Sequence, residues 1–177
     1  MNSSFNLDNA IRKVPDFPKP GILFYDITSI LTNPPAFKYC ISAFKALCKE
    51  QKIDALAAVE SRGFLFAAPV AESLGIPLIL IRKKGKLPGD TYSCSYALEY
   101  GTAEIEMHKA DISEGMNIAV IDDLIATGGT LKAAQTIIEQ AGAQVSSFLG
   151  VVGLPFLNYE QVLSPIPVHT LINYSSE

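Results

Sequence analysis

The hydrophobic residues of this chain form short continuous runs, separated by longer stretches in which apolar residues recur with a helical period. The runs are too short for helices and rich in β-branched residues, which is typical of buried parallel strands. They lie at residues 53–59, 77–81, 118–121, 145–152 and 168–174. The helical stretches lie at residues 37–48, 64–74 and 131–141. This alternation predicts right-handed crossovers and an α/β fold with an open, mainly parallel, twisted sheet flanked by helices.

The remaining segments predict a hairpin and an irregular N-terminal arm. Residues 92–98 and 102–108 alternate between apolar and polar side chains around a turn that contains Gly101, which favours a β-hairpin. Residues 7–13 are compatible with a short helix, but the prolines of residues 14–21 exclude one there. Residues 22–27 are predicted to be extended or looped. Thr32 or Asn33 is expected to cap the first long helix.

The most informative stretch begins with the strand at 118–121, continues with Asp122 and Asp123, and ends in a loop of small residues before a helix that Gly142 should end. Unpaired N–H groups at a helix start favour an anion, and glycines let the backbone wrap closely around a phosphate. The carboxylates would repel that phosphate but suit the vicinal hydroxyls of a sugar. These features predict a sugar 5-phosphate site. The alternative is an ordinary strand-to-helix turn with solvated acids.

Two further segments have chemical potential but also simpler explanations. The sequence Glu60-Ser61-Arg62-Gly63 follows a predicted strand; it is either a capped turn with a solvated arginine or part of an anion site. The basic, breaker-rich segment 82–90 is either a solvated surface run or the start of a lid that carries cations to a phosphate-rich ligand.

Together these segments resemble the type I phosphoribosyltransferases, and the similarity to the adenine-specific members extends over nearly the full chain. The matching segments are 15–24, 26–27, 60–66, 81–89, 96–101 and 120–130. The resemblance implies a single domain over residues 1–177, with an N-terminal hood at about 1–33 and a flexible β-hairpin lid at about 83–108. It also implies the purine salvage reaction in which adenine and 5-phosphoribosyl 1-diphosphate (PRPP) give AMP and pyrophosphate.

The resemblance also assigns roles to individual residues. It gives the ribose hydroxyls to Asp122 and Asp123, and the 5-phosphate to Ala126, Thr127, Gly128, Gly129 and Thr130. It gives the pyrophosphate to Glu60, Ser61, Arg62, Gly63, Arg82, Lys83 and Lys86, with a cis peptide bond between Glu60 and Ser61. It gives the adenine to Leu23, Phe24, Tyr25 and Ile125. Its catalytic residues are Glu99, Tyr100 and Arg62, with Glu99 handling the imidazole proton of adenine.

The chain departs from the family at Tyr25, where many relatives carry arginine or lysine, so only the backbone contact of this residue is carried over. The cofactor implied is Mg²⁺, held mainly by substrate and water, with no protein side chain as a direct ligand. The expected partners are the small molecules of the reaction and a second copy of the chain in a homodimer.

Composition and charge exclude several other classes. A net charge of −4 argues against general nucleic-acid binding, and no apolar run reaches the ~18 residues of a membrane span. The N-terminus lacks a signal-peptide pattern, and the 3 cysteines have no metal or redox spacing, so the cytoplasm is the expected location. Two alternative functions stay open: a transferase for 6-oxopurines, and a regulator of the same fold that binds PRPP or a nucleotide without turnover.

Overall fold

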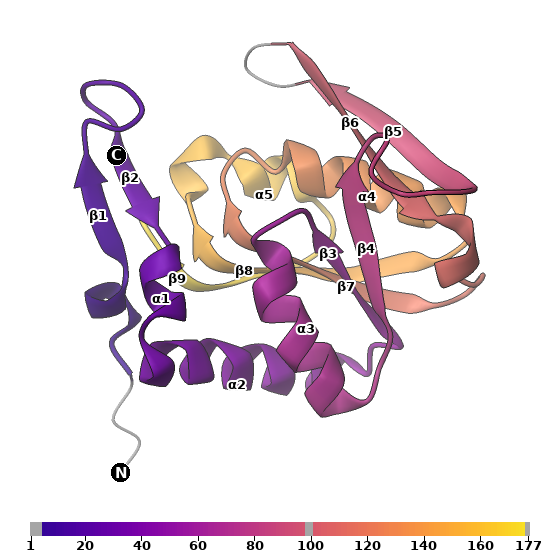
Figure 1. The fold of residues 1–177 in the computed structure, drawn as a ribbon, viewed down its shortest axis with the longest axis horizontal. Coiled ribbons are helices and arrows are strands. Elements are labelled where there is room, and N and C mark those ends of the chain that lie inside the picture. Colours follow the sequence, from indigo (N-terminus) through magenta and orange to yellow (C-terminus); the bar gives the residue numbers. More distant parts are fainter. Residues whose placement is uncertain (1–4, 98–100, 176–177) are drawn as a thin grey trace.

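The computed structural model describes residues 5–97 and 101–175, and within these residues the main architectural element is a seven-stranded sheet (Figure 1). Its strands, in spatial order, are β5 (Thr91–Ala97), β6 (Thr102–His108), β4 (Leu78–Lys83), β3 (Ala55–Val59), β7 (Asn117–Ile125), β8 (Gln144–Gly153) and β9 (Val168–Asn173). From β4 to β9 every neighbouring pair is parallel, whereas β5 and β6 add an antiparallel hairpin to the edge at β4. The predicted α/β fold is therefore confirmed.

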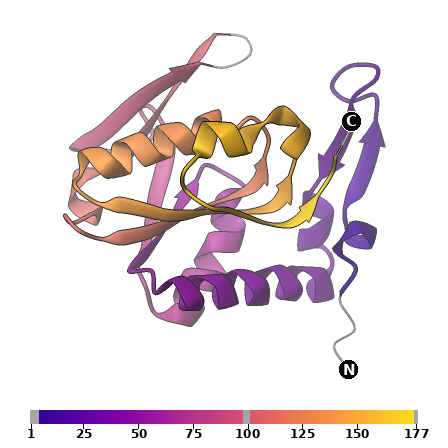
Figure 2. The ribbon, with the colours of Figure 1, turned by 180° about the vertical axis from the view of Figure 1, so that it is seen from behind.

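Helices cover both faces of the sheet, as Figures 1 and 2 show from opposite sides. The helices are α1 (Thr28–Leu31), α2 (Pro34–Gln51), α3 (Gly63–Leu74), α4 (Gly129–Gln140) and α5 (Tyr159–Leu163). Single 3-10 turns lie at Leu7–Ala10, Lys109–Asp111 and Pro155–Leu157. Side chains from α2 and α3 pack in one buried cluster with alternate residues of β3 and β7, and those of α4 and α5 pack in a second cluster with the residues between. This alternation is what a sheet buried on both faces requires.

The predicted helix boundaries follow from local chemistry. The side chain of Asn33 accepts the backbone N–H of Ala36 at 3.2 Å, so Asn33 rather than Thr32 caps α2. Gly75 ends α3 in the left-handed conformation, and Gly142 follows the last residues of α4 with φ +77°. On the stripe of α2, Cys40, Phe44 and Cys48 are fully buried.

Two boundaries differ from the prediction. The helix expected over residues 7–13 is wrong beyond Ala10, because Arg12–Pro15 forms strand β1, which pairs antiparallel with β2 (Leu23–Asp26). Strand pairing here outweighs a weak local helical preference. The strand predicted at 118–121 continues to Ile125, because its later residues pair with β8. Both aspartates therefore lie within β7 instead of after it.

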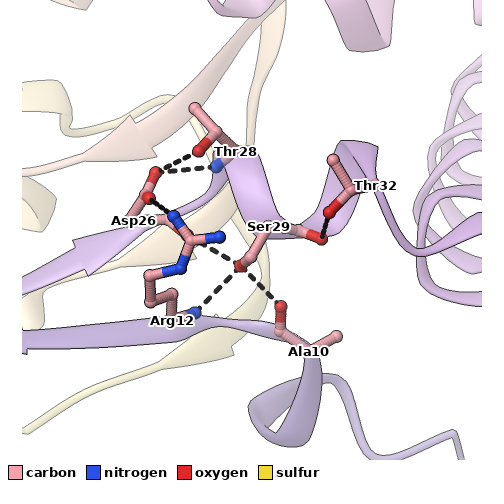
Figure 3. A network of polar contacts seen from close by, with 6 residues as sticks. All are labelled: Ala10, Arg12, Asp26, Thr28, Ser29 and Thr32. Carbon is pink, nitrogen blue, oxygen red and sulfur yellow. Dashed lines mark hydrogen bonds and ion pairs between the residues drawn. The ribbon is translucent and has the colours of Figure 1, made fainter.

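The β1–β2 hairpin is joined to α1 by a network of polar contacts (Figure 3). The side chain of Asp26 accepts hydrogen bonds from the backbone N–H and the hydroxyl of Thr28 and pairs with Arg12 at 2.9 Å. The hydroxyl of Ser29 accepts the N–H of Arg12 and lies 2.7 Å from the carbonyl oxygen of Ala10, to which it donates. These contacts fix the hairpin at the start of the helical layer.

The C-terminal end of the chain lies beside the same hairpin in both ribbon views (Figures 1 and 2). The ring of Tyr25, which is only 6% exposed, stacks on the ring of Tyr174 with centroids 3.8 Å apart and an interplanar angle of 12°. The hydroxyl of Tyr174 donates to Asp8 at 2.6 Å, and Asp8 pairs with Lys13 of β1. The hydrogen bond to Tyr174 and the pairing with Lys13 lower the pKa of Asp8, chiefly through the lysine.

Candidate active site

The carboxyl ends of β3, β4 and β7 meet at one edge of the sheet and enclose a cavity of about 270 Å³. Open parallel sheets commonly bind ligands at this edge, because the loops that follow the strands converge there. The lining residues are Val59, Glu60, Ser61, Arg62, Ile81, Lys83, Tyr96, Ile105, Asp122, Asp123, Leu124 and Thr130. The cavity thus brings together residues that the sequence analysis assigned to the pyrophosphate, the ribose and the 5-phosphate.

The loop after β3 lies unusually close to β7. The peptide bond between Glu60 and Ser61 is cis, as the family resemblance implied. A Cβ atom at Gly63 would lie 2.9 Å from the carbonyl oxygen of Ile121 and 3.2 Å from the Cα of Asp122, and both of these are backbone atoms. Only glycine fits this approach, which places Arg62 beside the acidic pair.

Arg62 is held by one of the two acids. Its Nε donates to Oδ2 of Asp123 at 2.6 Å, and Asp123 is only 4% exposed. Burial lowers the pKa of Arg62, but the hydrogen bond to Asp123 and the nearby charges of Asp123, Asp122 and Asp26 outweigh it and raise the pKa. The side chain of Arg62 is about half exposed and lines the cavity, so its remaining N–H groups can be offered to an anion there.

Asp122 is in a different electrostatic position from Asp123. It accepts the backbone N–H of Asp123 at 2.8 Å, and no side-chain cation bonds directly to it among the contacts of the described residues. Burial raises its pKa well above the ordinary aspartate value, and the neighbouring charge of Asp123 raises it further. The ionised form of Asp122 is therefore disfavoured by its surroundings in the free protein, and a ligand that donates hydrogen bonds would favour that form.

We expect Asp122→Asn to stabilise the fold increasingly as pH rises from about 4 toward neutrality. Because the folded-state pKa of Asp122 is raised, its stabilising contribution is complete below the unfolded pKa and is lost as pH rises through the folded pKa. Asparagine stays neutral and keeps an oxygen for the N–H of Asp123. Thermal melting of both proteins across this range measures the gap, and a gap that shrinks with rising pH would contradict the assignment.

Arg82, the second arginine predicted to bind the pyrophosphate, is held in the same manner. Nη2 of Arg82 donates to Glu60 at 3.0 Å, and the backbone N–H of Lys83 donates to the other carboxylate oxygen. The hydrogen bond from Arg82 is the largest of the effects that lower the pKa of Glu60, and the charge of Lys86 adds to it. Arg62 and Arg82, both predicted to bind the pyrophosphate, are therefore each held on a carboxylate that lines the cavity.

The loop after β7 forms a second, smaller cavity of about 90 Å³ beside the first. Its lining residues are Asp122, Leu124, Ile125, Ala126, Thr127, Gly128, Gly129, Thr130 and Leu131. Gly128 has φ +81° and precedes the first turn of α4, so the backbone there takes a path that side chains rarely allow. The hydroxyl of Thr130 lies 3.2 Å from that of Tyr96 on β5. All five predicted 5-phosphate residues therefore line one concave surface at a helix start.

The residues predicted to bind adenine lie in different surroundings and do not line one common cavity. The ring of Tyr25 is buried against Tyr174, and Leu23 lines a separate surface cavity near Gly21. The ring of Phe24 packs edge-on against Phe17 at 5.0 Å. The side chain of Ile125 is buried in the space left by Gly150. Glu99 and Tyr100 lie outside the described residues.

Leu124 and Tyr96 line the larger cavity but were missed by the sequence analysis. Leu124 lines both cavities, whereas its neighbour Ile125 packs into the core. Ile118 and Val120 belong to the same core cluster as Ile125. Strict alternation along the strand would instead have placed Ile125 on the opposite face of the sheet from these two residues. The available signal for Tyr96 was its alternation with Cys94 on the inner side of the hairpin.

Among residues 5–97 and 101–175, no group of three or more His, Cys, Asp or Glu side chains could hold a metal ion. In the same residues no helix is long and apolar enough to cross a membrane.

Comparisons with known proteins agree with this geometry. The family described as "Phosphoribosyl transferase domain" matches residues 26–153. The adenine phosphoribosyltransferase of Treponema denticola is 63% identical over 171 residues, which cover 97% of this chain and 90% of the relative. The crystal structure of the enzyme from Thermoanaerobacter pseudethanolicus superposes with a TM-score of 0.90 at 42% identity, covering 96% of this chain and 100% of that one.

A second solved structure contains ligands. Adenine phosphoribosyltransferase from Saccharomyces cerevisiae, complexed with an imino-altritol bisphosphate and adenine, has a TM-score of 0.89 and 40% identity, covering 94% of this chain and 96% of that one. The family match covers more than half of the chain, and the relatives are similar over nearly all of it. The chain therefore belongs to the phosphoribosyl transferase family, among its adenine phosphoribosyltransferases.

Proposed function

We propose that this protein transfers the 5-phosphoribosyl group of PRPP to adenine, giving AMP and pyrophosphate in purine salvage. Its relatives carry the name of this activity, and the yeast relative is a complex with adenine. The observation that carries the proposal is the contiguous edge on which an acidic pair separates a glycine-rich helix start from a group of cations. Along this edge the helix start would bind the 5-phosphate, the acidic pair would bind the diol, and the cations would bind the diphosphate of PRPP.

The ribose phosphate would be bound at both ends. Backbone N–H groups and the hydroxyls of Thr127 and Thr130 would donate to the 5-phosphate, with the dipole of α4 favouring its charge. Asp122 and Asp123 would accept hydrogen bonds from the two ribose hydroxyls. As the C1–oxygen bond breaks, the ring gains positive character, and the nearby carboxylates would stabilise that charge.

The leaving diphosphate would bind to cations that protein carboxylates already hold in place. Arg62 and Arg82 are each hydrogen-bonded to an acid at 3.0 Å or less, and Lys83 lines the cavity. Guanidinium groups bind phosphate oxygens through two parallel donors, so both arginines suit the diphosphate. Holding the cations in place before binding reduces the ordering required when the substrate arrives.

The base would approach C1 from the side of the β1–β2 hairpin. We propose that the backbone of Leu23 and Tyr25 reads adenine, since the ring of Tyr25 is already stacked on Tyr174. Leu124, which lines both cavities, is a better candidate than Ile125 for contact with the base. When N9 forms its bond to C1, the proton of the imidazole ring passes to Glu99, as the family resemblance suggests, and Tyr100 would stand beside it.

Mg²⁺ is the cofactor that this chemistry implies, and the residues present fit it. The carboxylate pair at the cavity, where charge repulsion contributes to the raised pKa of Asp122, is a place where a divalent cation is favourable. We propose that Asp122 and Asp123 hold it through water or substrate hydroxyls. When bound, Mg²⁺ would neutralise charge on the diphosphate.

Base specificity is the sharpest test of the proposed function. Pyrophosphate release from PRPP is to be measured with adenine, hypoxanthine, guanine and xanthine as acceptors, with and without Mg²⁺. We expect release with adenine and Mg²⁺ only. Release with hypoxanthine but not adenine would indicate a 6-oxopurine transferase, and no release with any base would indicate a binding protein of the same fold.

Three further expectations belong to the same proposal. We propose that the chain acts as one domain, with residues 1–33 as a hood and residues 83–108 as a mobile lid over the cavity. A homodimer is expected, and the mass of the protein in solution tests it. The cytoplasm is the expected location, since the described cysteines are free thiols, two of which are buried.

A further inference from the structure

Glu106 on β6 is a buried carboxylate for which the proposed reaction has no direct use. It is only 2% exposed, and its Oε1 accepts the backbone N–H groups of Lys86 at 2.8 Å and Leu87 at 2.9 Å. Burial raises the pKa of Glu106, but the N–H groups of Leu87, Lys86 and Gly85 and the charge of Lys84 outweigh it, so the pKa is lowered on balance. Glu106 is therefore a buried anion whose charge is satisfied by the loop after β4.

That loop carries the cations of the diphosphate site. The backbone N–H of Lys86 also lies 3.2 Å from the carbonyl oxygen of Lys83, which closes a tight turn. Nη1 of Arg82 donates to the carbonyl oxygen of Lys86, while its Nη2 donates to Glu60 at the cavity. The turn that Glu106 holds is thus bonded directly to the guanidinium that holds Glu60, a residue of the cavity lining.

The position of Glu106 in the sheet explains how it reaches the turn. Strand β6 pairs antiparallel with β4, and Glu106 lies opposite Arg82 in the register (Figure 1). Residues opposite each other on paired strands project from the same face, so Glu106 and Arg82 lie on one side of the sheet. The carboxylate that orders the cationic turn after β4 therefore comes from strand β6 of the hairpin.

We propose that Glu106 is a positioning residue for diphosphate binding, because it fixes the 83–87 turn, in which Lys83 lines the cavity and the carbonyl oxygen of Lys86 holds Arg82. This inference rests on the proposed function and adds to it a residue that touches no substrate. A loop rich in glycine and lysine would otherwise sample many conformations and would lose more freedom when the diphosphate binds. Ordering the loop in advance improves binding of the diphosphate without a new contact.

The strand offers a matched control in Glu104. Lys84 lies 3.5 Å from Glu104 and 3.8 Å from Glu106, so both acids contribute to the same surface ion pair. Glu104, however, is about one-third exposed, and within the described part of the chain its side chain accepts no hydrogen bond from the backbone of the turn. Glu104→Gln therefore removes the charge beside Lys84 and leaves the anchoring of the turn intact.

The test compares Glu106→Gln with Glu104→Gln in both directions of the reaction. For Glu106→Gln we expect the KM values for PRPP and for pyrophosphate to rise roughly tenfold, because the charge-assisted hydrogen bonds to the turn become neutral ones. The KM for adenine and the Kd for AMP, which contain no diphosphate, should change by less than about twofold. Glu104→Gln should change every constant by less than about twofold, as expected for a surface ion pair.

Equal weakening for all four ligands would overturn the inference, since it would indicate general destabilisation, and so would unchanged KM values for PRPP and pyrophosphate. If Glu106→Gln does not fold, Glu106→Asp provides the same comparison, because it keeps the charge but shortens the side chain by a methylene. Failure of the proposed function is distinguishable, since the unmodified protein would then release no pyrophosphate from PRPP with adenine.

Discussion

Asp123→Asn is expected to lower kcat/KM for PRPP by roughly 100-fold, because two hydrogen bonds to a charged acceptor, worth ~1.5–3 kcal/mol each, become neutral ones worth ~0.5–1.5 kcal/mol each. One is the bond from Arg62, which is 2.6 Å long in the structure, and the other is the proposed bond from a ribose hydroxyl. The loss should fall mainly on the use of PRPP, because adenine is proposed to bind elsewhere. Initial rates with varied PRPP at saturating adenine measure the change.

Asp54→Asn is a suitable control for this substitution. Asp54 directly precedes β3, so it lies at the amino ends of the strands, away from the cavity at their carboxyl ends. Its side chain also accepts a backbone N–H, from Asn117 at 2.8 Å. Its replacement removes an acid of similar type far from the cavity, so PRPP kinetics should stay within about twofold of the unmodified protein. If Asp123→Asn also left PRPP kinetics unchanged, the assignment of the ribose to this acid would be wrong.

Gly63→Ala is expected to lower PRPP use nearly as much as Asp123→Asn, because it displaces the backbone of the loop after β3. The added methyl group would lie 2.9 Å from the carbonyl oxygen of Ile121, and neither β7 nor the start of α3 can move without moving the site. We expect overpacking to lower the free energy of unfolding by about 1–3 kcal/mol. Because the displaced loop carries Arg62, kcat/KM for PRPP should also fall by roughly 100-fold. Denaturant unfolding and PRPP titrations measure the two effects.

Ser73→Ala separates a local effect from general damage to α3. Ser73 lies near the other end of this helix, where its hydroxyl bonds to the carbonyl oxygen of Val70 at 3.0 Å. Its loss should leave PRPP kinetics within about twofold and change stability by less than about 1 kcal/mol. A Gly63→Ala protein with normal stability and normal PRPP use would contradict the proposed close approach of the two backbones.

Much of the fold could be predicted because its signals are local. The apolar runs at β3, β7 and β8 are buried strands, and the caps at Asn33 and Gly75 depend on neighbouring backbone groups alone. Strand β1 could not be predicted in this way, since Arg12–Pro15 is extended only because β2 lies beside it. Pairing between distant segments is absent from a local pattern.

The same distinction between local signals and contacts of distant residues applies to the candidate site. Sequence motifs located the acids, the glycine-rich loop and the cations, because each follows a predicted strand in the chain. They did not reveal which acid binds which cation: Arg62 contacts Asp123, 61 positions away, and Arg82 contacts Glu60, 22 positions away. They also could not distinguish Leu124 from Ile125, since that choice depends on packing against Gly150.

The stack of Tyr25 on Tyr174 has a practical consequence for protein engineering. The ring of Tyr174 supports the strand that is proposed to read the base. A purification tag or fluorescent reporter joined directly after Tyr174 would therefore begin next to that strand. Affinities for adenine are best compared on untagged protein, or on protein from which the fusion has been cleaved.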